Sequence, residues 1–157
     1  MRLLSLLVLL LFAGSARAET ITLTTQQART VFVGLQALAG YEDQTNAKPM
    51  LRVYALSPAV RIAIKNDLVA LTPVIEAYNK ARGEELCRLV PTSCAIAKDD
   101  GPNMLAIAKF DEAAGKVKIT RDLTRMSVDD LQLDKNDHIT GSILAALAPV
   151  MALEPTK

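Results

Sequence analysis

The feature that most constrains this fold is a long helical pattern that begins at Ser57-Pro58 and stops near two cysteines. Its large apolar residues recur at steps of three and four, as on one face of a helix, whereas a half-buried strand would alternate by two. The Ser57 hydroxyl can cap the first turn, and Pro58 suits a first position that needs no N–H donor. The pattern predicts one long amphipathic helix with a buried face of Val60, Ile64, Leu68, Leu71, Ile75, Tyr78, Leu86 and Leu89.

Pro73 interrupts this pattern, because proline lacks the N–H that a helix interior needs. The apolar residues keep their phase on both sides of it, so we expect a kink in one helix and not two separate helices. The charged residues have mixed signs, with Glu76 and Lys80 one turn apart as an attractive pair, and they predict an ordinary solvated face. That face comprises mostly Arg61, Lys65, Asp67, Glu76, Lys80, Arg82 and Glu84.

The first residues are typical of a secretory signal peptide, with a basic start, a leucine-rich core and the small residues of Ala16-Arg17-Ala18. We predict a signal peptide at residues 1–18, cleaved after Ala18, and a single small globular domain at residues 19–157. The apolar run is shorter than the roughly 20 residues that cross a bilayer, so we expect no membrane insertion after cleavage. The expected location is the periplasm or the exterior.

The charge balance argues against a nucleic acid partner. The chain has 18 basic and 17 acidic residues. Cleavage removes Arg2 and Arg17 and leaves a slightly negative domain, which offers no general attraction for phosphate backbones.

Cys87 and Cys94 lie close together in the sequence, with Pro91 between them to end the helix and reverse the chain. In an exported protein this arrangement predicts a disulfide, with free thiols as the alternative. A redox-active pair is usually spaced Cys-x-x-Cys, and a metal site would need more ligands than the single histidine, His138, can add. We therefore predict a structural Cys87–Cys94 bond.

The shorter elements complete a mainly α fold of the α+β class, in which a long kinked helix packs against an N-terminal and a C-terminal helix beside a two- or three-stranded β element. Met50–Leu56 could extend the long helix or form an extended segment. Before the long helix we predict a strand at Glu19–Leu23 and a helix with a Thr24–Gln27 capping box that stops at Gly40. After it we predict a helix at Met104–Ala114, capped by Asn103 and ended by Gly115, and a strand at Lys116–Thr120. The remaining predictions are a single turn capped by Ser127 and Asp130, a short strand at Leu131–Leu133, and a closing helix headed by Thr140 and interrupted at Pro149.

A possible metal loop lies near the end of the chain. Asp134, Asn136 and His138 alternate as ligands of a calcium loop do, but the loop glycine is absent and Ala145 stands where glutamate is required. We predict no metal site and no cofactor.

His138 is also the one residue on which an acid–base mechanism could rest, with Asp134 or Asp137 as its partner. Because Thr140 and Ser142 stand where a helix cap is needed, we expect this segment to begin a helix. Two further clusters are candidates for surface roles. They are the acidic residues Asp129, Asp130 and Asp134, and the basic residues Lys116, Lys118, Arg121 and Arg125 as a docking edge.

The order of the elements resembles a group of small phage-encoded helical proteins of uncharacterised function. The resemblance rests on Leu-Thr-Thr-Gln-Gln and Leu-Gln-Ala-Leu at the ends of the first helix, the charged helix from Leu56 to Arg82, Phe110-Asp-Glu, Lys-Val-Lys-Ile, and the closing Asp-Asp-Leu-Gln-Leu and Ile-Thr-Gly-Ser-Ile-Leu-Ala-Ala-Leu. It covers most of the chain after the leader. These motifs are patterns of hydrophobicity, so the resemblance implies a helical fold and assigns no functional residue.

Two classes of function remain. The first is a small exported protein that binds a protein partner in the periplasm or cell envelope, as an accessory or inhibitor, without catalysis. The second is a periplasmic enzyme that uses His138 with neighbouring carboxylates. We favour binding, because the sequence has a single histidine and no catalytic motif in which other acid–base or nucleophilic residues accompany it.

Overall fold

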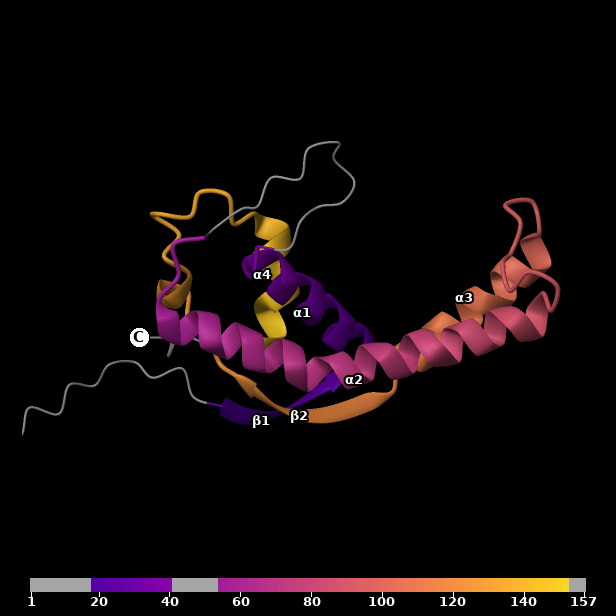
Figure 1. The fold of residues 1–157 in the computed structure, drawn as a ribbon, viewed down its shortest axis with the longest axis horizontal. Helices are drawn as coiled ribbons and strands as arrows, with labels where there is room; N and C mark the ends of the chain where they lie inside the picture. The colour runs from indigo at the N-terminus through magenta and orange to yellow at the C-terminus, as the bar shows by residue number, and fades with distance from the viewer. Residues whose placement is uncertain (1–17, 41–53, 153–157) are drawn as a thin grey trace, which may run out of the picture.

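The computed structural model describes residues 18–40 and 54–152, and the statements below concern these residues. It is mainly helical with one small antiparallel sheet, as the predicted α+β class requires (Figure 1). The elements are β1 (Ala18–Thr24), α1 (Thr25–Leu38), α2 (Pro58–Leu89), α3 (Gly101–Gly115), β2 (Lys118–Thr124), η1 (Asp129–Leu131), α4 (Gly141–Leu147) and η2 (Ala148–Val150). The leader through Arg17 and the first part of Met50–Leu56, residues 50–53, lie outside the described residues. Residues 54–56, the described part of that segment, are neither helix nor strand, and α2 begins after them.

Helix α2 is the longest element, and it begins where the sequence predicted. The hydroxyl of Ser57 accepts a hydrogen bond from the N–H of Val60 at 3.2 Å, and Pro58 opens the first turn. The helix passes through Pro73 and continues to Leu89 as one element, so the prediction of a single helix is confirmed. None of the helices in the described ranges is both long and apolar enough to cross a membrane.

Strands β1 and β2 pair antiparallel over their whole length, from Ala18 opposite Thr124 to Thr24 opposite Lys118. The predicted strand at Lys116–Thr120 therefore starts later and runs further than expected. One face of the sheet packs against the core through Ile21, Leu23 and Leu123. The opposite face is polar, and there the hydroxyls of Thr22 and Thr120 lie 3.1 Å apart.

The predicted third strand at Leu131–Leu133 is wrong. Ser127 and Asp130 exchange side-chain bonds with each other's backbone N–H, at 2.8 and 3.2 Å, which closes a helical turn at the place where the sequence predicted one. Gln132 then adopts a left-handed conformation with φ of 45°, which an extended strand does not allow. Within the described residues the sheet has two strands.

The start of α3 also differs from the prediction. Asp100 caps this helix, and its Oδ1 accepts the N–H of Asn103 at 3.2 Å. Asn103 was expected to be the cap, but Gly101-Pro102 can occupy the first turn because proline needs no N–H there. The capping box of Thr24 and Gln27 in α1 and the Thr140 cap of α4 are confirmed.

The core lies between α1, α4 and the first half of α2. Gly34 of α1 lets α4 approach closely, since a Cβ there would lie 3.1 Å from side-chain atoms of Ala146 and Leu147. Residues of α2 join the core only as far as Val74, and no α2 residue after Tyr78 is buried. The largest fully buried side chains are Leu35, Leu71, Leu123, Met126, Leu131, Leu147, Val31, Val60 and Val150.

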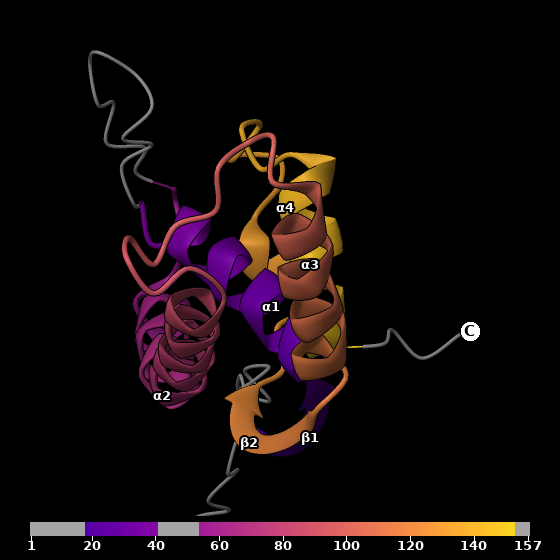
Figure 2. The same cartoon turned by 90° about the vertical axis from the view of Figure 1, so that its right-hand side faces the viewer.

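The remainder of α2 and the first part of α3 extend away from this core. Figure 1 shows the two helices side by side with a loop joining their far ends, and Figure 2 shows α3 crossing beside α2 at an angle. We call residues 79–106 the arm. It is joined to the body of the fold through Tyr78 and the second half of α3.

Candidate functional site

The structure places His138 at the surface. Its side chain is 66% exposed, and its Nε2 lies 3.3 Å from Oδ1 of Asp137, whose side chain is 83% exposed. Asp134 is exposed as well. A general base is normally oriented inside a cleft that can hold substrate, and these three side chains lie in solvent instead.

Asn136, between these exposed residues, points inward. Its Oδ1 accepts the N–H of Ala55 at 2.7 Å, and its Nδ2 donates to the carbonyl of Leu131, also at 2.7 Å. The amide therefore ties the segment before α2 to the segment before α4. Asn136 is buried whereas Asp134 and His138 are exposed, so the three side chains do not face a common point as the ligands of a metal loop do. The described residues contain no cluster of three metal-binding side chains.

The basic residues proposed as a docking edge do not form one surface. Lys116 pairs with Glu112 at 2.6 Å, and this bond lowers the pKa of the glutamate. Lys118 is exposed on the outer side of β2, whereas Arg121 is half-buried and shares the inner side with Ile119. Alternation along a strand separates such neighbours, so the run lacks a common face.

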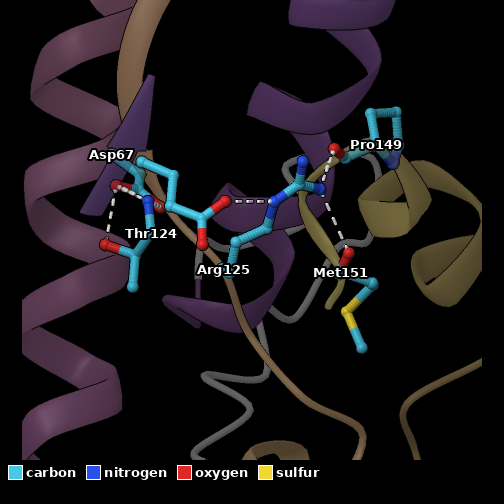
Figure 3. A network of polar contacts seen from close by, with 6 residues as sticks. Asp67, Thr124, Arg125, Pro149 and Met151 are labelled. Carbon is cyan, nitrogen blue, oxygen red and sulfur yellow. Dashed lines mark hydrogen bonds and ion pairs between the residues drawn. The ribbon is translucent and has the colours of Figure 1, made fainter. Parts of the chain in front are cut away.

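A buried carboxylate, Asp67 of α2, was missed by the sequence analysis. We predicted it on the solvated face, but its side chain lies against the end of β2 and is 2% exposed. It accepts hydrogen bonds from the backbone N–H of Thr124 at 3.0 and 3.1 Å and from the Thr124 hydroxyl at 3.1 Å (Figure 3). Burial raises the pKa of Asp67 to about 6, although the bonds from Thr124 oppose this shift.

Arg125, the next residue, extends to the other side of the chain, as Figure 3 shows. Its Nε lies 3.3 Å from the carboxylate of Glu19 in β1, and its Nη1 donates to the carbonyls of Pro149 and Met151 at 3.0 and 3.2 Å. This guanidinium therefore connects the first strand with the end of the last helical segment. The contacts satisfy backbone groups, so Arg125 has a structural role.

A second polar cluster lies where the arm meets the body. The Tyr78 hydroxyl donates to Oδ1 of Asp111 at 2.6 Å, and Nε of Arg82 lies 3.0 Å from the same oxygen. The guanidinium of Arg29 stacks 4.0 Å from the centre of the Tyr78 ring. Burial, and then the bond to Asp111, raise the pKa of Tyr78. The cluster joins α1, α2 and α3 and holds the arm at its base.

The sulfur atoms of Cys87 and Cys94 lie 2.03 Å apart, at disulfide distance, as their spacing predicted. The bond connects the last turn of α2 to the loop that leads to α3. It therefore closes the far end of the arm, where the helices have no buried residues of their own. Arg88 and Glu85 add a surface ion pair at 2.6 Å nearby.

The arm also carries adjacent apolar side chains in solvent. Met104 and Leu105 on α3 are 48% and 58% exposed, and Ala108, just past the arm, is exposed on the same side one turn later. We call these three residues the tip patch. Large apolar side chains on the surface are ordinary singly, but adjacent ones on a projecting element often mark a contact surface. The sequence predicted a helix at Met104–Ala114 but not the exposure of these side chains.

No protein family model, curated protein or solved structure matches this chain. The resemblance to small phage-encoded proteins therefore stays a prediction.

Proposed function

We propose that this protein is exported and acts by binding a protein partner in the periplasm or cell envelope, as an accessory or inhibitor-like protein without catalysis. The observation that carries this proposal is the arm with its tip patch. The apolar side chains of this projecting helix pair do not pack into the core of the protein itself. They are therefore suited to contact a groove or surface of another protein.

The form of the arm supports the same function. Binding surfaces gain affinity when they are ordered before the partner arrives, because less conformational freedom is then lost on association. The Cys87–Cys94 bond closes the end of the arm, and the Tyr78–Asp111–Arg82 cluster holds its base. The arm is therefore held at both ends, although it has little apolar core between them.

The cysteine pair also supports export. Disulfides of this kind persist in oxidising compartments and are rare in the cytosol. Together with the leader predicted at residues 1–18, it favours the periplasm or the exterior. The alternative, a periplasmic enzyme built on His138, has weaker support, because the ring and its neighbouring carboxylates are exposed.

The experiment tests processing and binding in the same cells. The full-length chain, with a photo-crosslinking amino acid in place of Leu105, is expressed in a bacterium that has a periplasm and is recovered from the periplasmic fraction. We expect a mature protein that begins at Glu19, with cysteines that alkylate only after reduction. On irradiation it should form one discrete crosslinked adduct with another protein.

The matched control carries the same photo-reactive residue at Val33, which is 62% exposed on α1 and lies outside the arm. The control should give no such adduct. Equal crosslinking at both positions would indicate nonspecific contact and would contradict the role of the arm. A product retained in the cytosol with its leader intact would contradict export.

A further inference from the structure

A separate open groove of about 300 Å³ lies between the middle of α2 and the inner side of β2. One wall consists of Pro73, Ala77 and Ala81 at successive turns of α2. The other consists of Val117, Ile119 and Arg121 at alternate positions along and just before β2. We call this groove the slot.

The slot exists because the facing residues of α2 are small. Asp67 holds the end of β2 close to α2 at Thr124. Further along, the helix presents alanines and a proline, which leave space that larger side chains would fill. Val117 remains 56% exposed at this place. Apolar walls of this kind favour an aliphatic group, because its burial releases water from both surfaces.

The charged side chain of the slot is Arg121. Arg121 lies on the inner side of β2, and its Nη1 donates to the carbonyl of its own neighbour, Thr120, at 2.7 Å. Among the residues that the structure describes, no carboxylate forms an ion pair with Arg121, whereas Arg82, Arg88 and Arg125 each have one. A half-buried guanidinium beside an apolar wall favours a carboxylate, which can accept two parallel hydrogen bonds from it.

We propose that the slot binds one aliphatic carboxylate, with its alkyl chain between α2 and β2 and its carboxylate on Arg121. The volume of the groove is at the small end of the range for ligand sites, which suits a single unbranched chain. The slot residues differ from those of the tip patch. The slot shares Ala81 with the arm but no residue with the tip patch, so either proposal can fail alone.

The test is calorimetric titration of the mature protein with hexanoate, octanoate, decanoate and dodecanoate, each below the concentration at which it forms micelles. We expect saturable binding of one molecule per chain. Affinity should rise about fourfold for each added methylene until the slot is full and then level off. Decyltrimethylammonium, which has a similar chain and the opposite charge, should bind at least about tenfold more weakly than decanoate.

Two variants locate the site. Arg121→Gln should weaken decanoate binding about tenfold, as expected for loss of a charge-assisted contact, whereas Lys118→Gln on the outer side of β2 should not change it. Ala77→Leu should fill the slot and abolish binding, whereas Ala59→Leu, at an exposed position near the start of the same helix, should not. Circular dichroism shows whether each variant is folded, and Ala81→Leu replaces Ala77→Leu if the latter is not.

The proposal is overturned if decanoate does not saturate, or if the cationic chain binds equally well. It is also overturned if Arg121→Gln and the slot-filling variant both bind decanoate like the wild type. If a photo-crosslinking residue at Ala77 captures a protein while the free carboxylates do not bind, the occupant is a side chain of a partner and the small-molecule site is wrong.

Discussion

The carboxylate of Asp67 accepts hydrogen bonds from both the backbone N–H and the hydroxyl of Thr124, and no cation shares it among the described residues. This contact fastens the middle of α2 to the end of β2. It also occupies a strand N–H that β1 does not use. A buried carboxylate without a positive partner is expensive to ionise, which is the cause of its raised pKa.

The first prediction concerns pH. The pKa of Asp67 is about 6 in the fold against an ordinary value of 3.8, so the folded state holds a proton that the unfolded state has released between these values. The contribution of Asp67 to stability is therefore fully present below about pH 4 and is lost as pH rises through about 6. The loss between pH 4.5 and 7.0 should be about 2 kcal/mol, as measured by urea unfolding at these two pH values.

Asp67→Asn isolates this effect, because the amide cannot ionise but its oxygen can still accept the N–H of Thr124. The variant should be at least as stable as the wild type at pH 7.0 and should lose most of its advantage at pH 4.5. Asp99→Asn, in an exposed loop, serves as the control. The same pH dependence in wild type and Asp67→Asn would show that other groups cause it.

The second prediction locates the core on α2. Leu71 is fully buried, so Leu71→Ala should cost about 2–5 kcal/mol in the free energy of unfolding. Leu68 is only partly buried and should cost less, and exposed Lys65→Ala should stay within about 0.5 kcal/mol. Chemical denaturation measures all three. Equal, small losses of stability in all three variants would mean that this part of α2 does not lie at the centre of the core.

The third prediction concerns the disulfide. Its short loop should stabilise the protein by about 2–3 kcal/mol on the chain-entropy estimate. Because the bond closes an arm without buried α2 residues, its loss should loosen the arm more than the body. In the Cys87→Ser, Cys94→Ser double variant, hydrogen exchange should therefore rise within residues 79–106 and change little in α1 and β2. Uniform acceleration across the chain would contradict a local role.

The fourth prediction contrasts two residues of one loop. Asn136→Ala leaves the N–H of Ala55 and the carbonyl of Leu131 without their side-chain partner, and should cost roughly 2 kcal/mol. His138→Ala, at the surface, should change the free energy of unfolding by less than about 0.5 kcal/mol. Thermal unfolding compares the two variants. A large loss of stability for His138→Ala with none for Asn136→Ala would contradict a buried structural role for Asn136 and a surface position for His138.

Local signals in the sequence predicted the ends of several helices well. Ser57 with Pro58, Thr24 with Gln27, and Thr140 act through neighbouring backbone groups, so the relevant contacts are close in the sequence. The same applies to the cysteine pair. Gly40, with φ of 81°, follows α1 where the helical pattern ended.

Contacts between distant segments could not be predicted in the same way. Asp67 looked like one charge among many on a solvated face, because its partner Thr124 is remote in sequence and belongs to a strand whose end was misplaced. Asn136 likewise resembled a loop ligand until the structure placed Ala55 beside it. The tip patch was missed because apolar periodicity alone does not show whether a helix face has a partner.

The most direct test of the central claim is the affinity of the mature protein for the partner captured by crosslinking at Leu105, measured by calorimetry or surface plasmon resonance. Leu105→Lys places a charge in the tip patch and should weaken binding at least about tenfold, which corresponds to about 1.4 kcal/mol, without changing the fold. Val33→Lys, at a comparably exposed position on α1, should bind like the wild type. Unchanged affinity for Leu105→Lys, or an equal loss for both variants, would contradict partner binding through the arm.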